Sequence, residues 1–157
     1  MNRRICVLGL LAISLAGCAS MQPKNVVQVI GSDPDLSTLS KLISDAGLNE
    51  TLASTGPFTV FAPTNEAFKA VSAKTMAELA ANKDQLKRVL TYHVLPAKSA
   101  AAEVKAGTMK TVNGADVALA RTANFVTVDE ALVTTADKVA TNGVVHVIDR
   151  VLLPPKQ

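Results

Sequence analysis

The periodicity of the chain changes near its middle, and this change limits the folds that are open to it. Apolar residues recur at helical spacing from Leu36 to Ala46, after a start signal at Asp33–Asp35 and before Gly47 as a stop. The second half is rich in valine and threonine instead, and Asn113-Gly114 and Asn142-Gly143 are strong hairpin signals. Helices followed by hairpins predict an α+β domain with an antiparallel sheet.

Local signals place the individual elements. Capping residues predict further helices that begin at Thr64, at Thr75 and at Asn82, the last two with a capping box. A short helical turn is expected over Ser99–Lys105. Strands are predicted over Phe58–Ala62, Met109–Val112, Asp116–Arg121, Phe125–Val128, Ala131–Thr135, Lys138–Thr141 and Val144–Leu153, the last as a central strand.

The N-terminus has the features of an export signal. Arg3 and Arg4 precede an uncharged run over Ile5–Ala16, which at twelve residues is too short to span a bilayer. The following Leu15-Ala16-Gly17-Cys18 resembles the bacterial lipobox, in which the cysteine is acylated. This predicts a lipoprotein signal peptide over residues 1–17, a lipid on Cys18 and a short tether over 18–24. The alternative is an ordinary signal with a cysteine near the cut by chance.

Ala19, rather than Asp, follows Cys18, and in similar enterobacterial proteins this goes with transfer to the outer membrane. We therefore expect an exported protein, anchored by lipid in the outer membrane of the bacterial envelope.

Charge and composition exclude several classes of function. The formal charge is 16 − 13 = +3, and removal of Arg3 and Arg4 with the signal leaves 14 − 13 = +1. A nearly neutral chain without Trp and with one Tyr has neither the basic patch nor the stacking platform of a nucleic-acid binder. Cys6 is discarded with the signal, so a disulfide framework and a cysteine zinc site are excluded.

Three segments carry a resemblance to a known family. Thr59–Phe68 and Asn142–Leu152 resemble the two signature segments of fasciclin-like domains, and Leu90–Pro96 resembles the Tyr-His segment of that family. The order and spacing agree over a domain that we place at residues 25–155. The resemblance implies a fasciclin-like wedge of two small, antiparallel-rich β-sheets at a steep angle, with several α-helices along one edge. It also implies adhesion or protein and matrix contact, without a shared catalytic centre.

The signature residues are expected to be structural. We expect Thr59 to hydrogen-bond across the sheet, Asn65 to lie in the first turn of a helix and Asn142 to open a tight turn with positive φ. His146 is expected to be a buried, hydrogen-bonded core residue. A strand places it on the opposite face from Asp149, so the two cannot form a dyad without a bulge. The structural set is Thr59, Phe61, Pro63, Thr64, Asn65, Phe68, Asn142, Gly143, His146 and Asp149.

The candidate partner-binding residues are Tyr92, His93, Val94 and Leu95. In animal relatives a matching Tyr-His pair and its apolar neighbours are linked to receptor binding. The alternative is that all four pack in the core, with the Tyr92 hydroxyl bonded to a backbone group.

The expected function is that of a non-enzymatic, lipid-anchored envelope binding module for adhesion or protein and matrix interaction. Its partner would be a protein, a matrix polymer or another envelope component, and its contact with the membrane would run through Cys18. One alternative is a structural envelope protein without a dedicated ligand. The other is a hydrolase or metal-dependent enzyme that uses His93 or His146. No catalytic motif, metal-ligand spacing or cofactor-binding loop is present in the sequence, so no catalytic residue, metal or cofactor is expected.

Overall fold

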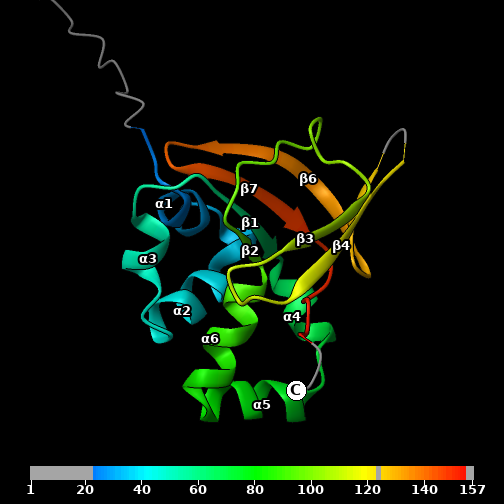
Figure 1. Ribbon diagram of the computed structural model, residues 1–157. Helices are drawn as coiled ribbons and strands as arrows, with labels where there is room; N and C mark the ends of the chain where they lie inside the picture. The colour runs from blue at the N-terminus through cyan, green and yellow to red at the C-terminus, as the bar shows by residue number, and fades with distance from the viewer. Residues whose placement is uncertain (1–22, 123–124, 155–157) are drawn as a thin grey trace, which may run out of the picture.

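The computed structural model describes residues 23–122 and 125–154, so Cys18 and residues 1–17 lie outside the described residues. Helices occupy most of the first half and strands most of the second, as the change of periodicity predicts (Figure 1). The helices are α1 Val26–Gly31, α2 Ser37–Asp45, α3 Asn49–Ala53, α4 Asn65–Ala70, α5 Ala73–Ala81 and α6 Lys83–Tyr92, with a 3-10 turn η1 at Pro34–Leu36. The strands are β1 Phe58–Pro63, β2 Val94–Leu95, β3 Gly107–Lys110, β4 Asp116–Arg121, β5 Val126–Val128, β6 Ala131–Ala140 and β7 Gly143–Ile148.

The sheet is mixed rather than purely antiparallel. The seven described strands lie in the order β2-β1-β7-β6-β5-β4-β3. β1 and β7 run parallel, from the pair Phe58 and Gly143 to the pair Pro63 and Ile148, whereas the other neighbouring strands are antiparallel. A parallel pair needs a long crossover, which the chain supplies through the three helices and five strands between β1 and β7. The α+β class is confirmed.

One hydrogen-bonded order joins all the described strands, and the two small sheets at a steep angle that the resemblance implies stay a prediction. β6 makes the connection, since it pairs with β5 at Ala131 and Leu132 and with β7 from Val133 to Ala140. Its register with β7 shifts twice between Val133 and Lys138, and Asp137 takes a φ of 58° there. The two strands predicted over 131–135 and 138–141 are therefore a single irregular strand.

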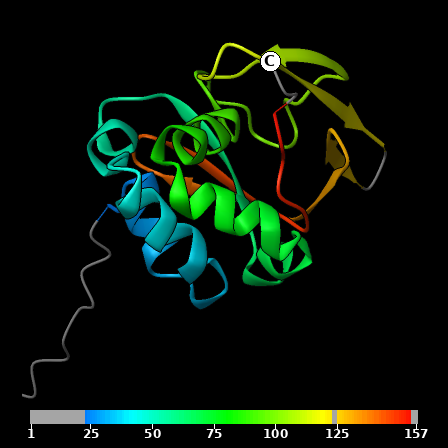
Figure 2. The ribbon, with the colours of Figure 1, turned by 90° about the horizontal axis from the view of Figure 1, so that it is seen from below.

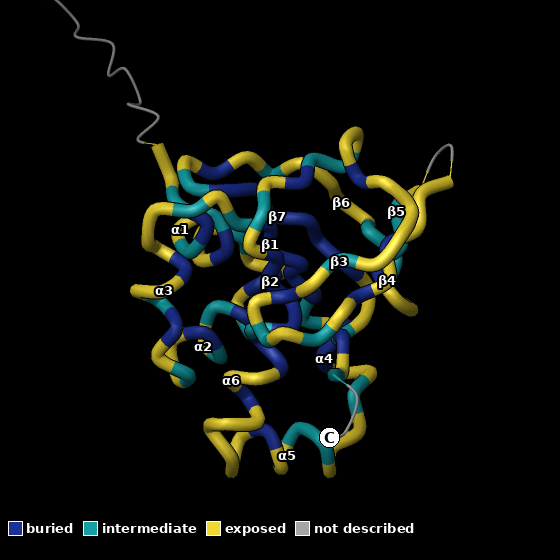
Figure 3. The backbone as a smooth tube through the Cα atoms, viewed as in Figure 1, coloured by how far each residue is buried: buried dark blue, intermediate teal, exposed yellow. Residues whose placement is uncertain are grey.

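β1 and β7 are covered on both faces, which explains their nearly continuous apolar sequences. On one face, Val60 and Val145 belong to a cluster with the apolar sides of α1, α2, α3 and α6. On the other face, Phe61 and Ile148 pack with residues of β2, β4, β5 and β6. Figure 2 shows the helices gathered on one side of the molecule and the β4–β5 hairpin on the other, and Figure 3 shows the buried strands between them.

Other predicted boundaries shift for identifiable reasons. β7 ends at Ile148, not Leu153. The Asp149 amide still donates to the Leu132 carbonyl oxygen at 3.1 Å, but the Leu132 amide donates to the Asp149 carboxylate at 2.8 Å. α5 begins at Ala73 rather than at Thr75, because the Ser72 side chain caps the Thr75 amide at 3.2 Å. Residues 101–103 form a turn, and the rest of 99–105 is irregular rather than helical.

Candidate functional site

The structure places the expected partner-binding residues in the core. Tyr92, His93, Val94 and Leu95 are between 0% and 4% exposed. The apolar spacing of α6 directs one face of the helix toward the sheet, and Tyr92 lies on that buried face. The chain then continues into β2, where Val94 and Leu95 are also buried. The expectation of a contact surface at these four side chains is therefore corrected, and the core alternative holds.

Tyr92 joins α6 to the second half of the chain. Its hydroxyl lies 2.8 Å from Asp129 Oδ2 and 3.1 Å from the Asp116 carbonyl oxygen, so its single proton is shared between these two acceptors. Asp129 is fixed in turn by two bonds to Ala118, with its backbone amide donating at 2.7 Å and its Oδ1 accepting at 2.9 Å. Burial, followed by the hydrogen bond to Asp129, raises the pKa of Tyr92 to about 12. A neutral, donating hydroxyl is what this position requires.

His93 holds the C-terminal segment against α6. Its Nδ1 lies 2.7 Å from the Val89 carbonyl oxygen, and its Nε2 accepts a hydrogen bond from the Leu152 amide at 3.0 Å. These partners define a neutral ring with the proton on Nδ1. Burial lowers the pKa of His93 to about 4, although the bond to Val89 acts in the opposite direction. The ring has no free nitrogen for acid–base chemistry.

His146, on β7, also uses both of its ring nitrogens in hydrogen bonds. Its Nδ1 accepts from the Asp137 amide at 3.1 Å, so the proton lies on Nε2, which donates to the Ser99 carbonyl oxygen at 2.8 Å. The residue is buried and stacks on Phe61, in line with the expected core role. Asp149 bonds to Leu132 instead of approaching His146, so the pair forms no dyad.

Thr59 and Asn65 connect segments that lie far apart in the sequence. The Thr59 hydroxyl donates to the Ala97 carbonyl oxygen at 2.6 Å and accepts from the Ser99 amide at 2.8 Å, so it fixes the loop after β2 rather than a sheet neighbour. Asn65, in the first turn of α4, accepts from the Thr38 amide at 2.9 Å and donates to the Pro34 carbonyl oxygen at 2.9 Å. Because α2 has no side-chain cap of its own, Asn65 caps it from outside.

Asn142 and Gly143 fix the start of the parallel pair β1 and β7. Asn142 accepts from the Val26 amide at 2.9 Å and donates to the carbonyl oxygens of Leu52 and Ser54 at 2.7 and 2.9 Å. The expected positive φ is absent at Asn142. Gly143 is required for space instead, since a Cβ there would lie 2.0 Å from the Phe58 carbonyl oxygen.

The remaining signature residues shape the turn from β1 into α4. Pro63 ends β1, and Thr64 caps α4 through the Ala67 amide at 3.2 Å, as predicted. Phe61 and Phe68 are buried on opposite faces of the sheet. Every polar side chain of the structural set is thus used in an internal bond.

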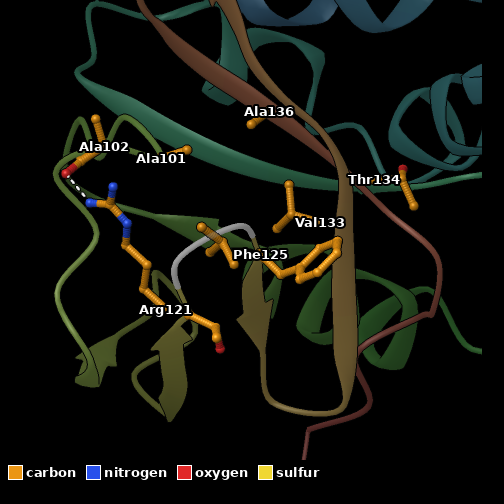
Figure 4. Close-up of a pocket in the computed structure, with 9 residues that line it drawn as sticks. Ala101, Ala102, Arg121, Phe125, Val133, Thr134 and Ala136 are labelled. Carbon is orange, nitrogen blue, oxygen red and sulfur yellow. Dashed lines mark hydrogen bonds between the residues drawn. The ribbon is translucent and has the colours of Figure 1, made fainter.

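One open hollow is lined by none of the signature or candidate partner-binding residues, and it lies between the β4–β5 hairpin, β6 and the turn at Ala101 (Figure 4). We call it the β5–β6 groove. It has a volume of about 300 Å³, and its lining includes Arg121, Phe125, Val133 and Thr134. Phe125 is 57% exposed. The sequence analysis did not predict this groove. The one local signal for the groove in the sequence was Phe125, at the start of a predicted strand.

Within residues 23–122 and 125–154, no three His, Cys, Asp or Glu side chains are grouped so that they could hold a metal ion. No helix in the described part of the chain is both long and apolar enough to cross a bilayer.

Fold and site together define an α+β domain whose signature residues serve its architecture and whose open hollow is a surface groove. A sequence profile of the Fasciclin domain matches residues 34–154. The chain therefore belongs to the fasciclin domain family.

Similar proteins occur in bacteria and animals. Protein sll1483 of Synechocystis sp. is 45% identical over 83% of this chain and 73% of its own length. Cell surface glycolipoprotein MPB83 of Mycobacterium bovis is 34% identical over 88% of this chain and 64% of its own. Among solved structures, a FAS1 domain pair from the insect cell adhesion molecule Fasciclin I has a TM-score of 0.66 at 21% identity. That alignment covers 83% of this chain and 51% of the insect chain, so it shows the fold alone.

Proposed function

We propose that the chain is a non-enzymatic, lipid-anchored binding module of the bacterial envelope, which holds a partner protein or matrix component. The observation that carries this proposal is the internal use of both histidines. Their four ring nitrogens all bond to backbone groups, so neither ring can act as a base or a metal ligand without breaking the core. What the domain offers to other molecules is its surface.

The anchor is proposed from the sequence. A signal peptide over residues 1–17 would be removed, Cys18 would carry the lipid, and residues 18–24 would tether a domain at 25–155. The relative MPB83 is a cell surface glycolipoprotein, which supports an anchored member of this family. The insect protein that shares the fold is a cell adhesion molecule, which supports a role in contact. Ala19 after the cysteine favours the outer membrane.

Two measurements test this function. Cys18→Ser should abolish labelling of the chain with radioactive palmitate, and continued labelling would contradict the anchor. Wild-type chain should then be used as bait for chemical crosslinking in intact envelopes. A saturable partner that an unlabelled chain competes away supports a binding module. If only non-saturable neighbours are captured, the chain is a structural envelope protein without a dedicated ligand.

A further inference from the structure

We propose that the β5–β6 groove binds an extended peptide segment that carries a carboxylate, supplied by a partner protein. This inference rests on the proposed binding function and names the chemistry of the partner. It assigns the contact to a part of the domain that the family signatures do not include.

The first observation is an open strand edge. β5 and β6 pair only at Thr127–Leu132 and Val128–Ala131, while β6 continues to Ala140 with β7 on its other side. Among the described residues, the edge of β6 that faces β5 therefore has no strand neighbour after Leu132. A strand edge of this kind offers backbone donors and acceptors to an added extended segment.

The second observation is the composition of the walls. Phe125 and Val133 present apolar surface on the hairpin and β6 sides, and the exposed Thr134 follows Val133 along the strand (Figure 4). Thr122 and Phe125 exchange two backbone hydrogen bonds, at 2.8 and 3.3 Å, which fix the backbone that carries the aromatic ring. Apolar walls beside an open strand edge suit a peptide with alternating apolar side chains.

The third observation is charge. Arg121 is the only charged residue among the described residues that line the groove. One of its Nη1 hydrogens is donated to the Ala102 carbonyl oxygen, which holds the guanidinium beside the groove, and no other acceptor among the described residues bonds to it. Asp137, the acidic residue that follows the lining residue Ala136, is bonded to the Ala101 amide at 2.8 Å. A fixed guanidinium at an apolar wall selects a carboxylate, because the two groups match in geometry and in charge.

The experiment uses a displayed library of random eight-residue peptides, panned against the purified, exported chain. Enriched peptides should combine Asp or Glu with alternating aliphatic or β-branched residues. Their binding should fall about three- to tenfold in Arg121→Gln, because one partly exposed charge-assisted contact is lost. Phe125→Ser should weaken the same peptides. Amide shifts in NMR spectra of the complex should lie at Arg121, Phe125 and Thr134.

Arg88→Gln is the matched control, since it removes the same charge from the exposed face of α6. It should leave peptide binding unchanged, and both Arg variants should keep the wild-type melting temperature. Enriched peptides without an acidic residue, equal binding by Arg121→Gln and Arg88→Gln, or amide shifts elsewhere would each overturn the assignment.

The same variant separates this inference from the function on which it rests. A partner captured equally by wild type and Arg121→Gln would leave the binding module intact and reject the groove. Concentration-dependent shifts at Phe125 and Thr134 without any peptide would show that a second copy occupies the groove, and would also reject it. No captured partner would contradict the proposed function itself.

Discussion

Phe61 and His146 are register partners on the parallel strands β1 and β7, and their rings stack with centroids 5.7 Å apart and planes at 28°. The pair lies on the second and third strands of the described order. The His146 ring also bonds to β6 and to the loop after β2, through Asp137 and Ser99. One imidazole therefore links three parts of the chain around a single aromatic neighbour.

Replacing His146 by Ala should lower the free energy of unfolding by about 2–3 kcal/mol. The substitution leaves a cavity beside Phe61 and leaves the Ser99 carbonyl oxygen and the Asp137 amide without their partner. Denaturant unfolding followed by circular dichroism measures the change. Val139→Ala, at a side chain that is 70% exposed on β6, should stay within about 0.5 kcal/mol of wild type. A stable His146→Ala variant that had lost partner binding would overturn the structural role.

His93 should make the stability of the domain depend on pH. Its pKa is about 4 in the folded chain and 6.5 in the unfolded one, so the unfolded state binds the proton more readily. The contribution of neutral His93 is fully present above pH 6.5 and is lost as the pH falls toward 4. The shift of about 2.5 pKa units corresponds to about 3 kcal/mol.

Unfolding measured from pH 7 to pH 4 in wild type and in His93→Gln checks this expectation. The variant should be less stable at pH 7, and its stability should fall less between pH 6.5 and pH 4. Parallel pH curves for the two proteins would show that His93 does not titrate in this way.

Tyr92 is the only tyrosine, so its ionisation can be followed without interference. Tyrosinate absorbance in the folded protein should appear with a midpoint near 12, whereas the denatured chain should titrate near 10. Asp129→Asn should lower the folded midpoint, because the carboxylate that accepts from the hydroxyl is removed. A folded midpoint of 10 would contradict the burial and bonding described for this side chain.

Asn65 should behave as a helix cap supplied from another element. Asn65→Ala removes the acceptor of the Thr38 amide and the donor to Pro34, and should cost about 1–2 kcal/mol. Asn65→Asp keeps the acceptor and loses the donor, so its loss should be smaller. Chemical denaturation of both variants tests the order. Equal losses would mean that the cap on α2 contributes nothing measurable.

Gly143 and Gly114 should respond differently to the same substitution. Gly143→Ala forces a Cβ to within 2.0 Å of the Phe58 carbonyl oxygen, which would separate β1 from β7, and should cost more than about 3 kcal/mol. Gly114 has a φ of +89° but open space around it, so Gly114→Ala should cost only about 1 kcal/mol. Thermal melts of the two variants compare the cost of a steric clash at Gly143 with the cost of a positive φ at Gly114.

Local signals in the sequence predicted part of the local structure. Thr64 and Asn82 cap the predicted helices, and Asn113-Gly114 joins β3 to β4, because these features depend on neighbours within a few residues. The parallel pairing of β1 with β7 could not be predicted in this way. It joins residues 85 apart in the chain, and apolar sequence on both faces gives no direction to a strand.

The site was harder to predict than the fold. An apolar segment with a tyrosine and a histidine is equally consistent with a core and with an interface, and only the packing of α6 on the sheet distinguishes them. The β5–β6 groove has no sequence motif, because it arises where two strands that begin as neighbours move apart.

The place of β7 in the sheet also determines when the chain can fold. β7 is the last strand in the sequence, yet it lies between β1 and β6 and contributes to both hydrophobic clusters. Neither cluster is complete until residues 143–148 are available, and pairs so distant in sequence form slowly. During synthesis from the N-terminus, the chain therefore cannot complete either cluster until almost its whole length is available. The order of the strands thus delays completion of the core until synthesis is nearly finished.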